Sequence, residues 1–278
     1  MRKIKLLHIQ LLPLLSGAQN MMLNLLKGLD KNKYEIYVLS KPGGPLVEEV
    51  KKNNFHYIPI NSLRRNLSFW DVIAFIIMIR IFRKYRFDII HTHSSKTGFL
   101  GRIAGHFARV PKIIHTVHGF PFHQFQPRYV RKFYQAMERL ASRFCDYVVF
   151  VNNSERELAI AKKIVSLNKA LTIYNGIEPP DINILKSSMK TDNFVIGSVL
   201  RFCKQKNVIN TVKAAITVCR VNSKINFVFI GDGEELNECI KIVDDVKMAE
   251  RIQFPGWQTN IFEWLIGFDV FLLFSKWE

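Results

Sequence analysis

Segments typical of β-strands alternate with segments typical of α-helices along the whole chain of 278 residues. Short apolar runs such as Ile4–Ile9 and Tyr34–Leu39 have the length and composition of buried strands. Longer amphipathic stretches such as Gly17–Leu29 separate them. Strands that alternate with helices form parallel sheets, because each helix returns the chain to the start of the next strand through a right-handed crossover. The pattern therefore predicts an α/β fold.

A polar, turn-rich segment interrupts this alternation between Asn175 and Asp192. It contains an Asn-Gly pair and a Pro-Pro pair, both of which favour turns over regular structure. The strand-and-helix pattern then resumes at Phe194–Val199. We therefore expect two Rossmann-like domains with doubly wound parallel sheets that face a cleft, the first at residues 1–180 and the second at residues 181–278.

Polar residues gather where two predicted strands of the first domain end. The strand Asp88–His91 leads into a run of Thr, His and Ser, and the strand Lys112–Val117 leads into His and Gly. Open α/β sheets bind their ligands outside the carboxyl ends of their strands. These two tips therefore indicate one wall of an active site, to which His93, Ser94 and Lys96 are expected to contribute.

Two other interpretations of the first tip stay open. Histidine pairs bind metals, but no third ligand is visible near His91 and His93 at a suitable spacing, and we expect no metal. Ser94, Ser95 and Lys96 open a predicted helix whose N-terminus could receive an anion. Helix capping explains the two serines equally well.

The net positive charge of the chain is confined to the first domain. Residues 1–180 contain 28 Lys and Arg against 11 Asp and Glu, a net charge of +17, whereas residues 181–278 contain 12 of each. Basic residues are interleaved with large aromatic ones from Arg64 to Phe133. Such mixed segments suit an anionic membrane surface, and the chain has no signature of nucleic-acid binding. We therefore expect a membrane surface as a partner, and no nucleic acid.

The location of the protein is inferred from the cysteines and the apolar runs. Four cysteines lie far apart without metal-binding spacing, which favours free thiols in a reducing compartment. The apolar run Val72–Ile79 is far shorter than the roughly 20 residues that span a bilayer. No signal peptide is recognisable at the N-terminus. We therefore expect a cytoplasmic protein, peripheral at the inner face of the membrane.

Eight short motifs follow one another in a fixed order. They are SGAQNMMLNLLKGL (Ser16–Leu29), HTHSSKTGFLGR (His91–Arg102), HTVHGFPFH (His115–His123), IYNGI (Ile173–Ile177), IGSVLRFCKQKN (Ile196–Asn207), FVFIGDGEE (Phe227–Glu235), IQFPGW (Ile252–Trp257) and FLLFSKWE (Phe271–Glu278). This series resembles the retaining nucleotide-sugar glycosyltransferases of the GT-B fold, in glycosyltransferase family 4. HTVHGFPFHQFQ is similar to enzymes of capsule and exopolysaccharide pathways.

The resemblance implies roles for residues of both domains. The acceptor side would include His93, Ser94 and Lys96. Arg201 and Lys206 would bind the donor diphosphate and stabilise the departing charge without a metal. His118 would lie against the donor sugar, and Gly119 would allow a close approach of the backbone. The alternatives are solvated loop charges for Arg201 and Lys206, and a core histidine for His118.

Further donor contacts are implied by three glycines and one tryptophan. Gly17 corresponds to a glycine-rich turn near the donor phosphates, although a second glycine and an acidic residue of that motif are replaced here. Gly231 and Gly233 would let the backbone approach the nucleotide, or form an ordinary tight turn. Trp257 would lie by the nucleobase, or pack in the core.

The last motif departs from the family pattern. Glu278 matches the first of two catalytic, donor-contacting glutamates, and the second would follow the last residue of the sequence. Asn207 replaces a glycine. We therefore expect a C-terminally truncated second domain, an exposed strand at Val270–Phe274, and weak transfer activity.

These observations together predict a retaining glycosyltransferase. It would move a sugar from a nucleotide-sugar donor to a lipid-linked saccharide acceptor in bacterial surface-polysaccharide synthesis, without a cofactor or metal. Two alternatives are an inactive glycosyltransferase remnant and a basic membrane-binding module. A nucleotide-sugar epimerase of the same fold is a third, although its catalytic carboxylates are not evident.

Overall fold

The computed structural model describes residues 2–177, 180–181, 186 and 192–277. They form two compact units, Met1–Ile177 and Glu178–Glu278. Each unit is built on its own parallel sheet, as the alternating sequence pattern predicts. The expected α/β class with two Rossmann-like sheets is confirmed.

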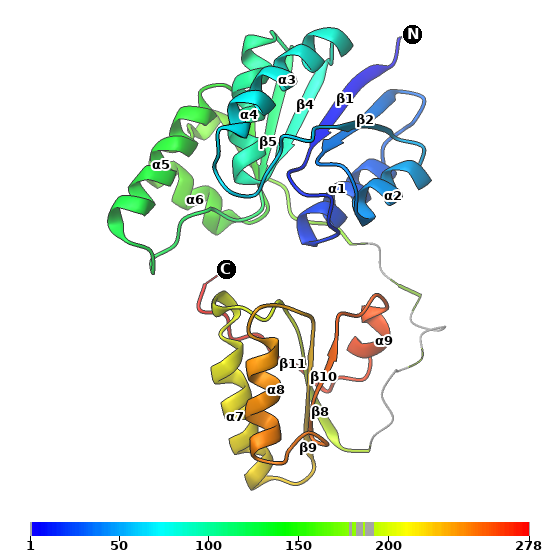
Figure 1. Cartoon of the computed structure of the whole chain (residues 1–278), viewed down its shortest axis with the longest axis vertical. Helices are drawn as coiled ribbons and strands as arrows, with labels where there is room; N and C mark the ends of the chain where they lie inside the picture. Colours follow the sequence, from blue (N-terminus) through cyan, green and yellow to red (C-terminus); the bar gives the residue numbers. More distant parts are fainter. Residues whose placement is uncertain (1, 178–179, 182–185, 187–191, 278) are drawn as a thin grey trace. The chain divides into compact units, whose positions relative to one another are not determined.

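The first unit contains seven strands in the order β3-β2-β1-β4-β5-β6-β7 (Figure 1). The strands are β1 (Ile4–Ile9), β2 (Tyr34–Ser40), β3 (His56–Pro59), β4 (Ile89–His93), β5 (Lys112–Val117), β6 (Tyr147–Phe150) and β7 (Ala170–Thr172). The helices are α1 (Gly17–Lys27), α2 (Pro45–Lys52), α3 (Trp70–Tyr85), α4 (Ser95–Phe107), α5 (Arg128–Ser142), α6 (Asn153–Ala161) and the short 3₁₀ helix η1 (Leu167–Lys169).

Alternate residues of each strand in this sheet contact helices on opposite faces. In β2, Ile36 and Val38 pack with α1 and α2, whereas Tyr37 and Leu39 pack with α3. Figure 1 shows α1 and α2 beside β1 and β2. A parallel sheet is stable only when helices cover both of its faces, and that requirement accounts for the continuous apolar runs in the sequence.

Helix α4 begins at Ser95, within the run of residues that the sequence predicted to open it. The backbone N–H of Gly98 donates to the carbonyl of Ser94 at 2.8 Å, so the glycine lies within the first turn. A Cβ at Gly98 would lie 2.4 Å from the ring of His115. The glycine therefore brings α4 close to β5 and does not mark the start of the helix.

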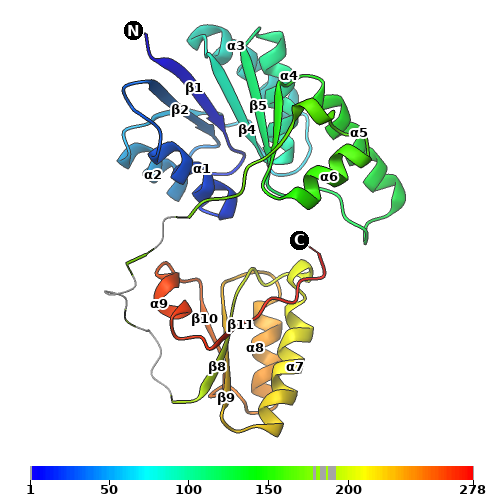
Figure 2. The same ribbon diagram turned by 180° about the vertical axis from the view of Figure 1, so that it is seen from behind.

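The second unit contains four strands in the order β10-β9-β8-β11 (Figure 2). They are β8 (Phe194–Val199), β9 (Ile225–Ile230), β10 (Ile252–Gly256) and β11 (Val270–Phe271), with helices α7 (Val208–Val221), α8 (Leu236–Asp245) and α9 (Ile261–Leu265) and the 3₁₀ helix η2 (Lys204–Lys206). In β9, Phe227 and Phe229 pack with α7 and α8, while Val228 and Ile230 pack with α9. Both faces of this sheet are therefore covered.

The last strand is shorter than expected, because only Val270 and Phe271 pair with β8. The exposed fractions of Val270, Phe271, Leu273 and Phe274 lie between 42% and 57%, so the expected exposed apolar segment is present.

The four cysteines are buried free thiols, as the spacing predicted: Cys145, Cys203, Cys219 and Cys239. Among the described residues, no helix combines the length and the apolar character that crossing a membrane requires.

Candidate functional site

The strand order of the first sheet reverses between β1 and β4. The chain passes from β1 outward to β2 and β3, then returns to the other side of β1 with β4. His8 of β1 is in register with His91 of β4, and His93 lies on the same face two residues further on. Open α/β sheets bind ligands outside the carboxyl ends of their strands at such a switch point. Three imidazoles therefore lie where binding is expected.

The imidazoles of this cluster are stacked and hydrogen-bonded. The ring centroids are 5.1 Å apart for His8 and His93, 4.5 Å for His91 and His93, and 5.3 Å for His93 and His118. Nδ1 of His8 lies 2.9 Å from Nε2 of His93, and Nδ1 of His93 lies 3.0 Å from Nε2 of His118. His118, on the loop after β5, is thus connected to the buried sheet by two consecutive hydrogen bonds.

Burial keeps these rings neutral. Desolvation, with a further contribution from neighbouring histidines, holds the pKa of both His8 and His93 well below the ordinary value. Desolvation, helped by His118, lowers the pKa of His91 to about 3. Desolvation also lowers the pKa of the half-buried His118. Near pH 7 the cluster therefore offers hydrogen bonds without a net charge.

His8 corrects the expectation that no third imidazole accompanies His91 and His93. The candidate ligand atoms of these three residues lie within 4.8 Å of one another. The separation of 2.9 Å between His8 and His93 is nevertheless that of a hydrogen bond. The third ring, His91, is hydrogen-bonded through its Nε2 to Oγ1 of Thr116 at 2.7 Å. The geometry favours a hydrogen-bonded cluster over a metal site.

His118 lines a cavity of about 230 Å³ together with Ser94, Gly119 and Glu138. Gly119 has a φ of +122°, a conformation that glycine adopts readily. Glu155 fixes the following residue, because its Oε1 accepts a hydrogen bond of 3.2 Å from the backbone N–H of Phe120. Burial raises the pKa of Glu155, and this backbone contact opposes the shift. The loop that carries His118 is therefore anchored on both sides.

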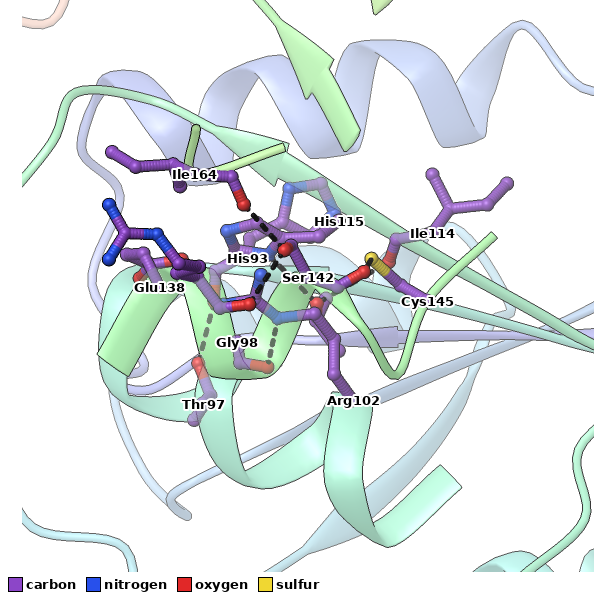
Figure 3. Close-up of polar contacts among 12 residues, drawn as sticks. His93, Thr97, Gly98, Arg102, Ile114, His115, Glu138, Ser142, Cys145 and Ile164 are labelled. Atoms are coloured by element: carbon purple, nitrogen blue, oxygen red, sulfur yellow. Dashed lines mark hydrogen bonds and ion pairs between the residues drawn. The ribbon is translucent and has the colours of Figure 1, made fainter. Parts of the chain in front are cut away.

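A buried ion pair supports the other face of β5 (Figure 3). Arg102 of α4, 1% exposed, donates from a terminal nitrogen to Oε2 of Glu138 of α5 at 2.7 Å, and from Nε to the carbonyl of Gly98 at 2.8 Å. His115 lies on this face, where its Nδ1 is 2.9 Å from Oγ1 of Thr92. Burial, and then the charge of Arg102, hold the pKa of His115 well below its usual value. His115 is therefore part of the scaffold.

The expected acceptor-side residues have different surroundings. His93 is buried in the middle of the imidazole cluster. Ser94 lines the cavity and has a φ of +64°, a strained conformation for a residue other than glycine and of the kind found at functional sites. Lys96 is instead committed within the unit, because its Nζ lies 2.6 Å from Oδ1 of Asp71 and donates to the carbonyls of Arg64 and Asn66. Lys96 therefore braces the loop before α3, and its place on the acceptor side stays a prediction.

Gly17 does not form the expected glycine turn. It is the first residue of α1, after the N-cap Ser16, and its φ is not in the left-handed region. A Cβ at this position would meet nothing within 4 Å. Neither the conformation nor the packing of the chain therefore requires glycine here.

Arg201 follows β8, at the point where the second sheet reverses its strand order between β8 and β11. Its guanidinium lies 3.2 Å from Oε2 of Glu234, and both side chains are more than half exposed. Lys206 ends η2, a turn further along the same loop. Asn207 is left-handed, with a φ of +55°, which explains how it replaces a glycine, since asparagine tolerates that conformation best among the other residues.

The loop after β8 is fixed by the Gly231–Gly233 turn. A Cβ on Gly231 would lie 1.9 Å from the carbonyl oxygen of Leu200, and one on Gly233 would lie 2.3 Å from that of Phe202. The N–H of Phe202 donates to the carbonyl of Asp232 at 3.0 Å. The glycines thus allow two backbone segments to pack directly, which positions the loop that bears Arg201.

The remaining donor-site predictions concern Trp257 and Glu278. Trp257 follows β10 and is 66% exposed, so it is not a packing residue within the second unit. Glu278 lies outside the described residues.

The sequence analysis missed His8 and Glu155 as residues of the site. A histidine in the middle of the apolar strand Ile4–Ile9 was nevertheless a visible sign of a buried polar group.

Comparison with protein families assigns both parts of the chain. Residues 15–180 match Glycosyltransferase Family 4, and residues 181–278 match Glycosyl transferases group 1. These two matches divide the chain within the polar segment that follows β7.

Characterised relatives and solved structures extend these matches. The chain is 34% identical to UDP-Gal:alpha-D-GlcNAc-diphosphoundecaprenol alpha-1,3-galactosyltransferase of Escherichia coli, over 99% of the chain and 74% of that protein. It is 25% identical to the alpha-monoglucosyldiacylglycerol synthase of Acholeplasma laidlawii, over 90% of the chain and 68% of that protein. The crystal structure of Anabaena HepE with UDP and glucose superposes with a TM-score of 0.76 at 16% identity, over 98% of the chain and 74% of HepE. This likeness confirms the GT-B type of fold.

Replacement of Arg102 by Met is expected to destabilise the first unit by about 3–5 kcal/mol, because it leaves the Glu138 carboxylate buried without its partner. The double variant Arg102→Met/Glu138→Leu is expected to recover most of that loss, since it removes both charges. Urea unfolding of the single and double variants measures the difference. A double variant no more stable than Arg102→Met would show that the ion pair is not the reason for the loss.

Lowering the pH from 7.5 to 5.5 is expected to reduce the free energy of unfolding. The unfolded imidazoles bind protons below a pKa of about 6.5, while the lowered pKa values of His8, His91 and His93 keep the folded rings neutral. Stability is therefore complete above about pH 6.5 and is lost as the pH falls from there toward 3. Each buried ring that stays neutral lowers the free energy of unfolding by roughly 1 kcal/mol at pH 5.5.

Urea unfolding at the two pH values tests this, followed by far-UV circular dichroism. His91→Phe should show a smaller drop than the wild type, by about one ring's contribution. His56→Gln is the matched control, because the His56 side chain is 59% exposed. Equal stability of the wild type at both pH values would contradict the prediction.

Proposed function

The chain belongs to glycosyltransferase family 4, and we propose that it transfers a sugar from a UDP-sugar to a lipid-linked saccharide in the assembly of a bacterial surface polysaccharide. One observation supports the proposal: the candidate residues for donor binding lie at or beside the topological switch point of each sheet. His118 is linked to the switch point of the first sheet, and Arg201 follows that of the second. The Escherichia coli relative, which by its name uses UDP-Gal and a diphosphoundecaprenol acceptor, supports the substrate class.

We propose that Arg201 and Lys206 bind the diphosphate of the donor. Both are cations in a loop that is held by backbone contacts with the Gly231–Gly233 turn. Their charges would stabilise the leaving nucleoside diphosphate, so the reaction would require neither a metal nor another cofactor. Glu234 competes for Arg201 in the absence of donor, and an exposed ion pair of this kind is weak enough to be displaced.

The sugar and the base would be contacted by other parts of the chain. His118 is neutral and half-buried, which suits a hydrogen bond to a sugar hydroxyl. Trp257 offers an exposed aromatic face for the nucleobase. Glu278, which lies outside the described residues, is proposed as a further donor contact on the family motif alone.

Retention of the anomeric configuration is part of the proposal. The departing phosphate would accept the proton of the attacking acceptor hydroxyl on the same face of the sugar, so that the new bond forms on the side where the old one breaks. This route needs no covalent nucleophile from the protein. It gives the two cations the larger share of the catalysis, because the charge that develops in the transition state is carried by the phosphate.

The acceptor side is proposed to dock on an anionic membrane through α5. Tyr129, Phe133, Ala136 and Leu140 form an exposed stripe along one face of this helix, and Arg128, Lys132 and Arg139 are exposed beside it. Tyr129 is 75% exposed and Phe133 is 51% exposed. Apolar residues flanked by cations are typical of helices that lie in the membrane interface. A lipid-linked acceptor would be met at that surface.

Donor binding is tested with the substitutions Arg201→Ala and Lys206→Ala. Each is expected to raise the Kd for UDP about 10- to 100-fold, because each removes one charge-assisted contact to phosphate. Isothermal titration with UDP and UDP-galactose measures the effect, and the anomeric configuration of the transfer product tests retention. Inversion in that product would refute the mechanism but not the donor site.

Lys213→Ala is the matched control, since it removes an exposed cation from α7, away from the loop after β8. It should bind UDP like the wild type. If the double variant Arg201→Ala/Lys206→Ala also bound UDP as the wild type does, the proposed donor site would be wrong. If the wild type binds UDP but transfers no sugar, the inactive-remnant alternative would be favoured.

Membrane docking is tested with the double variant Tyr129→Ser/Phe133→Ser. It is expected to bind vesicles of phosphatidylglycerol at least about tenfold more weakly, because two large apolar side chains no longer enter the interface. Co-sedimentation measures binding, and raised salt should weaken it further. Val221→Ser serves as control, since Val221 is 85% exposed on α7 of the other unit. Equal binding by wild type and double variant would exclude α5 as the docking surface.

A further inference from the structure

The imidazole cluster fixes more than the position of His118. A neutral imidazole has one N–H donor and one bare nitrogen, so a hydrogen bond at one nitrogen dictates what the other can do. His93 uses both of its ring nitrogens, one toward His8 and one toward His118. The three rings therefore share one direction of donation, either outward from His8 to His118 or inward from His118 to His8.

The buried end of the cluster decides between the two directions. Nε2 of His8 is fully buried and has no hydrogen-bond partner among the described residues. Inward donation would leave a buried N–H at this atom with no acceptor, whereas outward donation leaves only a bare lone pair. Orphaned buried N–H groups are the rarer of the two in proteins, and each unsatisfied donor costs about 1–3 kcal/mol. The outward direction is therefore favoured.

We propose that His8 and His93 are positioning residues that hold His118 as its Nδ1–H tautomer, so that His118 presents a hydrogen-bond donor to the ligand. Nδ1 of His8 donates to Nε2 of His93, and Nδ1 of His93 donates to Nε2 of His118. The proton of His118 is then confined to Nδ1, to which no other described residue is hydrogen-bonded. The inference rests on the proposed function only in naming the ligand, a sugar oxygen of the donor.

The consequence is a choice of ligand atom. A histidine free to exchange tautomers serves as donor or acceptor, whereas this one is restricted to donation. His118 would therefore recognise an oxygen lone pair of the sugar and would disfavour a ligand group that can only donate. His91 stacks on His93 at 4.5 Å but bonds to Thr116 at 2.7 Å, so it lies beside the hydrogen-bonded series and not within it.

Nuclear magnetic resonance of the wild-type chain tests this directly. Long-range ¹H–¹⁵N correlation of ¹⁵N-histidine-labelled protein distinguishes the two neutral tautomers, and His118→Gln identifies the signals of His118. At pH 7.5, without ligand, His118 should be the Nδ1–H tautomer, as should His93 and His8. Observation of the Nε2–H tautomer at His118 would overturn the proposal, whether or not the protein binds UDP.

Two variants separate positioning from packing. His93→Phe keeps a stacked ring but removes both hydrogen bonds, so His118 should lose its single tautomer, and kcat/KM for transfer should fall about tenfold, the worth of one hydrogen bond. The affinity for UDP, which has no sugar to contact, should not change. His91→Phe is the matched control and should keep the Nδ1–H tautomer of His118.

Two results would count against the assignment. If His93→Phe left the tautomer of His118 unchanged, the hydrogen bond from His93 would not be what fixes it. Stoichiometric Zn²⁺ binding by His8, His91 and His93, seen as shifts of their ring nitrogens in metal-stripped protein, would replace the hydrogen-bonded arrangement with a metal site. Loss of UDP binding in Arg201→Ala, by contrast, bears on the proposed function alone.

Discussion

Burial of polar rings at the carboxyl ends of β1 and β4 is the constraint on which the candidate site of the first unit depends. Imidazoles in a dry interior must stay neutral and must find partners, because neither a charge nor an unpaired donor is stable there. His8, His91 and His93 meet both conditions by stacking and by bonding to each other, to Thr116 and to His118. These contacts hold the rings in place, and the hydrogen bond from His93 also holds His118, the one ring of the cluster that lies on a loop.

In the second unit, the candidate site consists of cations on the loop after β8. The side chain of Arg201 is more than half exposed, and an exposed ion pair such as that of Arg201 with Glu234 adds little rigidity. The loop is instead held through its backbone, because Gly231 and Gly233 leave room for the carbonyls of Leu200 and Phe202. The guanidinium of Arg201 stays exposed while the backbone beneath it is fixed, an arrangement that suits the binding of a flexible diphosphate.

The sequence predicted the fold well, because parallel sheets impose long apolar strands and amphipathic helices at regular intervals. It also indicated the tips of β4 and β5, where the structure brings His93 and His118 together. It did not reveal the long-range contacts that surround a residue. Lys96 is a cation at a helix start, but only the three-dimensional structure shows that Asp71, 25 positions earlier, takes up its charge. His8 was missed because its partners lie on β4, far along the chain.

Gly98 and Gly17 show the same limit from another direction. A glycine in a sequence suggests a turn, yet Gly98 lies inside α4, where the ring of His115 leaves no room for a Cβ. Gly17 opens a helix and would accept a side chain. The local sequence indicates which backbone conformations are allowed, while tertiary packing determines which of them the chain adopts. The same reasoning explains why the direction of the histidine hydrogen bonds cannot be read from the motif HTH. It depends on one nitrogen of His8 that has no hydrogen-bond partner within the described part of the chain, and only the folded sheet reveals this.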